Sequence, residues 1–220
     1  MFKYNSKRVA KLFDDWVETK QSYNIIPKIV AATAFAELKL RKKDVVLDIG
    51  TGLGNWAIKA AKICNQVIGI DISKKSLERA ERNAKKEKLN NVIFAYGSFE
   101  EPCKILDLNL YPINKILAVY SLHHLPDELK KECLITIVKF LKRPGRIVIG
   151  DMMFFDNPNK HKDKFDEINY DKGDTDFPAT TQFLIECFEK QLAKIKVIQI
   201  HPLAGVILAD FGLRNIFFNH

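Results

Sequence analysis

A carboxylate and three glycines lie close together where an apolar run ends. Asp48 is followed by Gly50, Gly52 and Gly54 in the segment Asp-Ile-Gly-Thr-Gly-Leu-Gly. Glycines at such a turn permit positive φ angles and let the backbone approach a ligand closely. The carboxylate would repel a pyrophosphate but suits a ligand with ammonium and sulfonium charge. Because the spacing also differs from the Gly-x-Gly-x-x-Gly of dinucleotide-binding proteins, we expect a cationic ligand here.

A second carboxylate, Asp71, ends the next apolar run, 67–70, and lies 21 residues beyond Gly50. A carboxylate at the end of such a strand can accept hydrogen bonds from both ribose hydroxyls, a role shared by NAD and S-adenosylmethionine proteins. Asp71 therefore indicates a ligand that contains adenosine.

Three further polar residues stand where later strands are expected to end. His123 and His124 follow the run 116–119, and Asp151 follows the run 147–149. A neutral imidazole can accept a proton from a reacting group, and a carboxylate can orient a hydroxyl or an amine. These are the candidate catalytic residues. The alternative is that the histidines only hydrogen-bond their loop and that Asp151 caps the loop after its strand.

The elements that must position these residues follow a repeated strand, turn and helix pattern. This pattern predicts an α/β fold with a doubly wound, mostly parallel sheet joined by right-handed crossovers. The closing runs are separated by only five residues and must be antiparallel. The expected strands are 45–49, 67–70, 92–95, 116–119, 147–149, 197–200 and 206–209, with a late helix over 181–194.

We expect one domain, 1–220, because no break in composition divides the chain. Two leading helices fall within 1–40, a cofactor-binding half covers 44–151, and a lid loop, a helix and the closing hairpin occupy 152–220. The polar stretch 156–176 is the loop or lid. The aromatic residues of the leading helices, Phe13, Trp16 and Tyr23, either line an acceptor pocket or belong to the core.

Composition narrows the class of protein. The formal net charge is +8, but the lysines are interleaved with acids and predict a solvated surface more than a nucleic-acid patch. The four cysteines form no Cys-x-x-Cys pair and have no histidines at metal-ligand spacing, which predicts buried thiols in a reducing compartment and no metal site. No apolar run approaches the roughly 20 residues needed to span a bilayer. We therefore expect a cytoplasmic protein without a membrane span, whose oligomeric state the sequence leaves open.

The segment 48–54 together with Asp71 resembles the motifs of class I S-adenosylmethionine-dependent methyltransferases, and the resemblance extends over nearly the whole chain. Two later segments, Ser-Leu-His-His-Leu at 121–125 and Leu-Lys-Arg-Pro-Gly-Arg at 141–146, are similar to the small-molecule branch typified by quinone-biosynthesis methyltransferases. The resemblance implies a seven-stranded sheet with the last strand inserted antiparallel. It also implies S-adenosyl-L-methionine as the cofactor and a small molecule as the methyl acceptor.

The resemblance further implies which residues bind the cofactor. The glycine turn would hold the methionine portion, Asp71 the ribose, and residues after the second and third strands the adenine. The family often has an acid near the adenine, and Gly97-Ser98-Phe99 stands there in this chain, so Ser98 would make a weaker polar contact. The implied cofactor-binding residues are Asp48, Gly50, Thr51, Gly52, Asp71, Ile72, Ser98, Phe99 and Tyr120.

Three alternatives remain open at this stage. The basic charge keeps an RNA methyltransferase, acting on tRNA or rRNA, as the nearest rival. A protein that kept the cofactor fold could instead serve as a binding or scaffold module without catalysis. An NAD oxidoreductase is the third interpretation.

Overall fold

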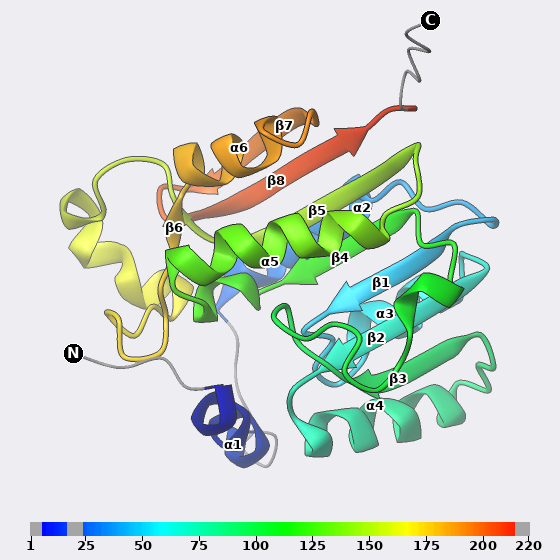
Figure 1. The fold of residues 1–220 in the computed structure, drawn as a ribbon. Coiled ribbons are helices and arrows are strands. Elements are labelled where there is room, and N and C mark those ends of the chain that lie inside the picture. Colours follow the sequence, from blue (N-terminus) through cyan, green and yellow to red (C-terminus); the bar gives the residue numbers. More distant parts are fainter. Residues whose placement is uncertain (1–5, 17–23, 214–220) are drawn as a thin grey trace, which may run out of the picture.

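The computed structural model describes residues 6–16 and 24–213, and its centre is one twisted sheet (Figure 1). The strand order along the sheet is β3-β2-β1-β4-β5-β8-β7. The first five strands in this order, β3, β2, β1, β4 and β5, are parallel, and β8 runs antiparallel to both β5 and β7. The predicted doubly wound sheet with its last strand inserted antiparallel is therefore confirmed. The strands are β1 (Val45–Ile49), β2 (Gln66–Asp71), β3 (Val92–Tyr96), β4 (Lys115–Val119), β5 (Gly145–Phe154), β7 (Lys194–His201) and β8 (Ala204–Phe211).

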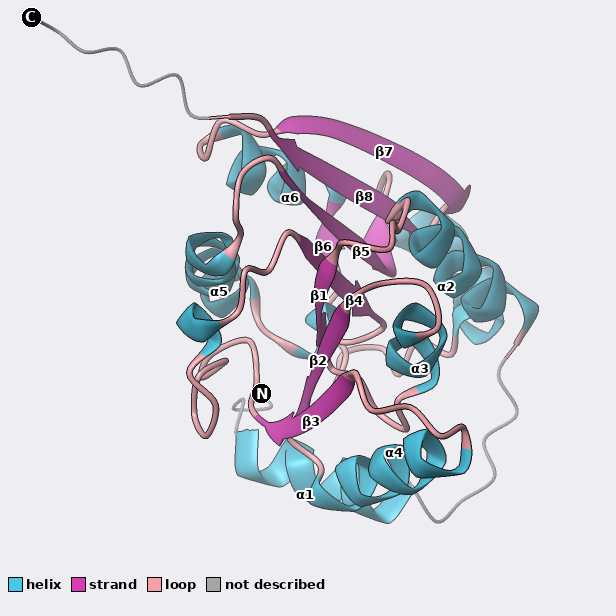
Figure 2. Cartoon of the chain, turned by 90° about the vertical axis from the view of Figure 1, so that its right-hand side faces the viewer, coloured by secondary structure: helices cyan, strands magenta, loops and turns pink. Residues whose placement is uncertain are grey.

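Helices cover both faces of this sheet (Figure 2). Helices α5 and α6 pack on one face, and α2, α3 and α4 lie on the other. Strand β1 is buried along its whole length, as expected for a central parallel strand covered on both faces. The helices are α2 (Ile25–Glu37), α3 (Asn55–Ala61), α4 (Lys74–Lys86), α5 (Asp127–Phe140) and α6 (Thr181–Glu189), with 3-10 helices η1 (Leu108–Leu110) and η2 (Leu122–His124).

The first helix, α1 (Ser6–Trp16), stands apart from α2 and lies beside the beginning of α4 (Figure 1). The carboxyl ends of β1, β2 and β4 face the same side of the molecule as α1. This placement puts α1 next to the loops that the sequence predicts to bind ligands. Within the described ranges, no helix is long and apolar enough to cross a membrane.

Strand β5 is longer than the predicted run 147–149. It extends to Phe154 because β8 pairs with it as far as Met152, and a two-residue strand, β6 (Ala179–Thr180), pairs with Met153 and Phe154. Two residues carry no alternation, so β6 had no sequence signal. The predicted helix 181–194 is shorter and ends at Glu189.

The polar stretch 156–176, predicted as a loop or lid, is helical in part. Its first part forms the 3-10 helix η3 (Pro158–Ile168). Phe165 and Ile168 are buried in the same apolar cluster as Leu203 and Val206, so η3 is attached to the body of the domain. Isolated apolar residues in a polar stretch gave too weak a period to predict this packing.

Candidate active site

The glycine turn after β1 is held close to the end of β4. Gly50 has a φ of +73°, and a Cβ built on it would lie 2.4 Å from the Cβ of Ser121. The Ser121 hydroxyl donates to the carbonyl of Ile49 at 3.0 Å. Glycine is therefore required at position 50 both by its backbone conformation and by this close approach.

Gly52, in contrast, faces open space. Its φ is +53°, and a Cβ built on it would meet no atom of the described chain within 4 Å. Its backbone N–H donates to Oδ2 of Asp71 at 2.8 Å, and the N–H of Ser73 donates to Oδ1 at 2.8 Å. Both Asp71 oxygens are thus fixed and still keep lone pairs for a ligand. Asp71 is 8% exposed, and its burial raises the pKa of the carboxyl group.

Asp48 lies beneath the same turn. It is 2% exposed and accepts a hydrogen bond from the hydroxyl of Thr51 at 2.7 Å. Burial raises the pKa of Asp48 to about 7, and the charge of Asp71 contributes in the same direction. No Lys, Arg or His of the described segments forms an ion pair with Asp48 or Asp71. The turn therefore presents two buried carboxylates without a cation of their own, which suits a positively charged ligand.

Tyr120 links this turn to the histidines. Its backbone has a φ of +49°, a left-handed conformation that is uncommon for an aromatic residue. Its ring lies 6.0 Å from that of His123, and its buried hydroxyl has no partner among the described residues. A buried hydroxyl without a partner is costly, which makes it a candidate contact for a ligand atom.

His123 is enclosed between two carboxylates. Its Nδ1 hydrogen-bonds Oδ1 of Asp151, and its Nε2 lies 3.4 Å from Oδ1 of Asp176. Burial disfavours the charged imidazole, but Asp151 and Asp176 outweigh that effect and raise the pKa of His123 to about 10. His123 is only 4% exposed, and both ring nitrogens face protein groups. This geometry gives it a positioning role rather than contact with an acceptor.

Asp151 is used entirely by the histidine loop. In addition to its contact with the His123 ring, it accepts hydrogen bonds from three backbone N–H groups, those of Leu122 at 2.9 Å, His123 at 3.2 Å and Met152 at 2.8 Å. It is 2% exposed. The expectation that it orients an acceptor directly finds no free oxygen here, because each oxygen already accepts two hydrogen bonds, three of them from residues of the 3-10 turn η2 and one from Met152.

His124 is the less enclosed of the two histidines, with 13% of its side chain exposed. Its Nδ1 lies 3.2 Å from the carbonyl of Thr175 and 3.4 Å from Oδ1 of Asp176. Burial and the neighbouring His123 lower the pKa of His124, and its Nε2 has no hydrogen-bond partner within the described residues. The hydrogen bonds from both histidines outweigh burial and hold the pKa of Asp176 below its usual range.

A second segment, 171–177, completes the cluster. The N–H of Phe177 donates to the carbonyl of His123 at 2.6 Å, and the Asp171 carboxylate accepts the N–H groups of residues 173–176. Lys130, 1% exposed, donates to the carbonyls of Leu125 at 2.5 Å and of Phe177. The buried lysine therefore fastens the 171–177 segment to the histidine loop.

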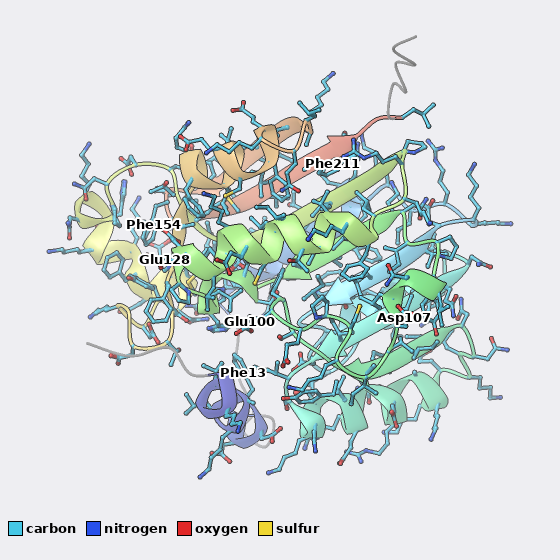
Figure 3. All side chains as sticks on the ribbon, in the orientation of Figure 1. Phe13, Glu100, Asp107, Glu128, Phe154 and Phe211 are labelled. Carbon is cyan, nitrogen blue, oxygen red and sulfur yellow. The ribbon has the colours of Figure 1, made fainter. Side chains whose placement is uncertain are left out.

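Helix α1 closes over both parts of the site. The ring of Phe13, on the side of α1 that faces the sheet in Figure 3, lies 4.8 Å from that of His124. Asp14 accepts a hydrogen bond from the hydroxyl of Ser73 at 2.6 Å, directly beside Asp71. Phe13 is thus at the acceptor side and not in the sheet core. Tyr23 and the side chain of Trp16 lie outside the described residues.

The three residues predicted to contact the adenine, Ile72, Ser98 and Phe99, differ in their surroundings. The Ser98 hydroxyl accepts the N–H groups of Glu100 and Glu101, and Phe99 is buried in the apolar core at 5% exposure. Ile72 follows Asp71 directly and is partly exposed. The ring of Phe99 is therefore not available to a ligand, and the contacts from Ser98 and Ile72 stay predictions.

Sequence reasoning missed Asp14, Ser121, Lys130 and Asp176. Ser121 stands within the segment 121–125 and Lys130 shortly after it, but the Ser121 contact with Ile49 and the Lys130 contact with Phe177 join residues distant in the chain. Asp176 lies 52 residues beyond His124, in a stretch predicted to be a loop. The sequence carries no signal for such a contact, because it depends on how the segment after η3 folds back.

A family model described as a methyltransferase domain matches residues 40–200. The rRNA methyltransferase RlmD of Legionella pneumophila, described as acting on uracil 1939 of 23S rRNA at C5, is 35% identical over 80 residues, which are 36% of this chain and 18% of that protein. An uncharacterized methyltransferase of Oceanobacillus iheyensis, OB1106, is 32% identical over 145 residues, covering 66% of this chain and 64% of the relative. The chain thus spans less than a fifth of the first of these relatives.

Among solved structures, the magnesium protoporphyrin IX methyltransferase of Synechocystis PCC 6803, determined with bound S-adenosylhomocysteine, is similar with a TM-score of 0.67 and 14% identity. The match covers 94% of this chain and 99% of that one. At this identity the likeness concerns the fold.

Proposed function

The chain belongs to the methyltransferase-domain family, as a class I S-adenosylmethionine-dependent enzyme, and from this premise we propose that it methylates a small molecule bound beside His124. The observation that carries the proposal is the position of His124, which lies at the end of β4 under Phe13 of α1 with 13% of its side chain exposed. A covered site of this kind favours an acceptor that enters whole over a polymer that lies across the surface.

The residues of the glycine turn fit the cofactor. S-adenosylmethionine supplies an activated methyl group on a sulfonium, and its amino acid portion also carries an ammonium group. Asp48 and Asp71 offer two buried carboxylates without a protein cation, and Gly52 leaves open space beside them. Asp71 accepts hydrogen bonds from the ribose, while Gly50, Thr51 and Gly52 hold the methionine portion. The unpartnered Tyr120 hydroxyl adds a polar contact.

The histidine loop positions the acceptor. Asp151 holds His123 from one side, and His123 in turn fixes Asp176 and the loop. His124 contacts the acceptor through Nε2, a ring nitrogen that has no protein hydrogen bond among the described residues. Holding the nucleophile in line with the sulfonium methyl is the main contribution that a methyltransferase must make.

The test combines binding with turnover. Calorimetry of the full chain is expected to show binding of S-adenosylmethionine and no binding of NAD. An ultrafiltrate of small metabolites, added with the cofactor, is expected to yield S-adenosylhomocysteine by mass spectrometry. Asp71→Asn is the matched variant and should lose cofactor binding and product together. Cofactor binding without any product from the ultrafiltrate would contradict the small-molecule proposal, and absence of cofactor binding would contradict the methyltransferase proposal itself.

RNA is the second candidate acceptor, because the net charge is +8 and the RlmD relative acts on rRNA. The RlmD match is short, however, and covers 80 residues of this chain. Filter binding of RNA over a salt series separates the two, since phosphate contacts give a steep dependence on salt. Product formed with RNA and not with the ultrafiltrate would favour this candidate.

A further inference from the structure

Three potential metal ligands converge at the acceptor side of the site. They are a ring nitrogen of His123, a ring nitrogen of His124 and a carboxylate oxygen of Asp176, and the three ligand atoms lie within 4.8 Å of one another. His123 and Asp176 are buried, and His124 is partly buried. The side chains come from η2 and from the 171–177 segment, which Lys130 and Phe177 fasten together.

The two distances from Asp176 match the separation of metal ligands as well as that of long hydrogen bonds. Oδ1 of Asp176 lies 3.4 Å from Nε2 of His123 and 3.4 Å from Nδ1 of His124. Good N–H···O hydrogen bonds have heavy-atom distances of about 2.7–3.2 Å. Ligands about 2.0–2.1 Å from a tetrahedral ion are separated by about 3.3–3.4 Å. Two edges of the cluster therefore match those of a tetrahedral coordination polyhedron.

The groups behind His123 and Asp176 are arranged as metal ligands require. A histidine ligand normally donates its other ring N–H to a carboxylate or a carbonyl, which fixes the ring. His123 does so through Nδ1 to Asp151. The second oxygen of Asp176, Oδ2, accepts the N–H of Asp171 at 3.1 Å, which leaves Oδ1 directed at the histidines.

We propose that His123, His124 and Asp176 form a binding site for a divalent first-row transition-metal ion. Two imidazoles and one carboxylate suit Zn²⁺, Fe²⁺ or Co²⁺ better than they suit Mg²⁺ or Ca²⁺, which prefer sites made only of oxygen ligands. Three protein ligands also leave a position open for another group. The sequence predicted no metal site because the four cysteines have no companion histidines at metal-ligand spacing, and Asp176 lies 52 residues beyond His124, where the sequence gives no signal that the two meet.

The metal site bears on the methyl acceptor, and this part of the inference rests on the proposed function. An ion on Nδ1 of His124 would replace the contact of that nitrogen with the Thr175 carbonyl, and the ring proton would then be on Nε2, where it could donate toward the acceptor. An ion held by three protein ligands would keep a position free, which could bind an acceptor through an oxygen atom. The inferred acceptor class is therefore a small molecule with a hydroxyl or carboxylate oxygen that can coordinate a metal.

The experiment is a titration of the chelator-treated full chain with Co²⁺, followed by visible absorption, with Zn²⁺ competition as a second measurement. One Co²⁺ per chain with ligand-field bands is expected, and Zn²⁺ should abolish the bands. Asp176→Asn and His124→Asn should each weaken Co²⁺ binding at least tenfold. His161→Ala is the control, because it removes another His–Asp pair, His161 with Asp156 at 2.7 Å, and should leave the binding unchanged.

Calorimetry with S-adenosylmethionine and circular dichroism are run on each variant. If one variant fails to fold, the wild-type titration and the other variant still decide. Absence of saturable Co²⁺ binding, or binding that Asp176→Asn and His124→Asn leave intact, would overturn the inference. Intact cofactor binding and turnover in metal-free protein would overturn only the metal's role, whereas loss of cofactor binding in every form would count against the proposed function.

Discussion

The two halves of the site handle charge in opposite ways. At the glycine turn, Asp48 and Asp71 are buried without a cation, and the described chain offers them only hydroxyl and backbone N–H donors. At the histidine loop, Asp151 and Asp176 are each bound to an imidazole. The first half depends on a ligand for its counter-charge, whereas both carboxylates of the second half already have a protein partner in the His123 imidazole, with or without an ion in the proposed metal site. Removing a charge should therefore weaken ligand binding at the turn and folding at the loop.

The largest expected effect is the loss of stability in Asp151→Ala. The substitution removes the partner of His123 and the acceptor of three backbone N–H groups in a site only 2% exposed. Breaking such a buried pair costs about 3–5 kcal/mol. Urea denaturation of the ligand-free protein measures this change.

Asp156→Ala is the control for that measurement, because Asp156 also pairs with a histidine but has an exposed side chain. We expect it to cost less than about 1 kcal/mol. Equal losses in the two variants would show that the histidine loop is not the balanced half of the site.

The next effect concerns the turn, where Asp71→Asn should weaken S-adenosylmethionine binding at least tenfold, about 1.4 kcal/mol. The amide keeps the shape but loses the charge and one acceptor oxygen for the ribose hydroxyls. The unfolding free energy of the ligand-free protein should also fall, though by less than in Asp151→Ala, because the amide nitrogen replaces an oxygen that accepts the backbone N–H of Gly52 or Ser73. Calorimetry measures the affinity, with the exposed Asp107→Asn as control. A change below twofold would contradict the ribose assignment.

The third prediction uses the pKa of Asp48, which burial raises from 3.8 to about 7. The folded state then prefers the protonated carboxyl, so the stability it contributes is complete below about pH 4 and is lost as the pH rises through about 7. Asp48→Asn lacks this loss. Its unfolding free energy relative to the wild type should therefore rise by about 1 kcal/mol or more between these pH values, since one pKa unit corresponds to about 1.4 kcal/mol.

Denaturant titrations of both ligand-free proteins across this pH range measure the difference. The amide oxygen that the substitution introduces would still accept the Thr51 hydroxyl, so the comparison isolates the charge. A stability difference independent of pH would show that Asp48 is ionised over the whole pH range. The turn would then not need a ligand cation to keep Asp48 ionised.

More of the glycine turn than of the histidine loop could be predicted from the sequence, and the reason is physical. Strand β1 was predicted with its exact bounds, and the cap of α4 by Ser73 follows from local chemistry, because strand, turn and helix are set by neighbouring residues. The histidines were found for the same reason. Asp176 and Lys130 could not be assigned roles, because these depend on a segment that returns to the loop after β5 and η3. Burial of Phe99 was missed because an aromatic after a strand gives no direction for its side chain.

The smallest expected effects come from α1, which touches both halves through adjacent residues. Phe13 packs on His124, with 4.8 Å between the ring centroids, and Asp14 accepts hydrogen bonds from Ser73 Oγ and Lys75 N at the start of α4. If the halves are independent, the two substitutions separate. Phe13→Ala should raise the acceptor KM two- to threefold, about 0.5 kcal/mol, with unchanged cofactor affinity.

Asp14→Ala should do the reverse, weakening the cofactor about two- to fivefold through the helix start that carries Ser73 and leaving the acceptor KM unchanged. Calorimetry and initial rates on the same preparations give both quantities, and circular dichroism confirms that α1 remains folded. If either substitution moved both quantities together, α1 would act as one cover over a single shared pocket. The difference in charge balance between the turn and the loop would then not divide the site into separate binding regions.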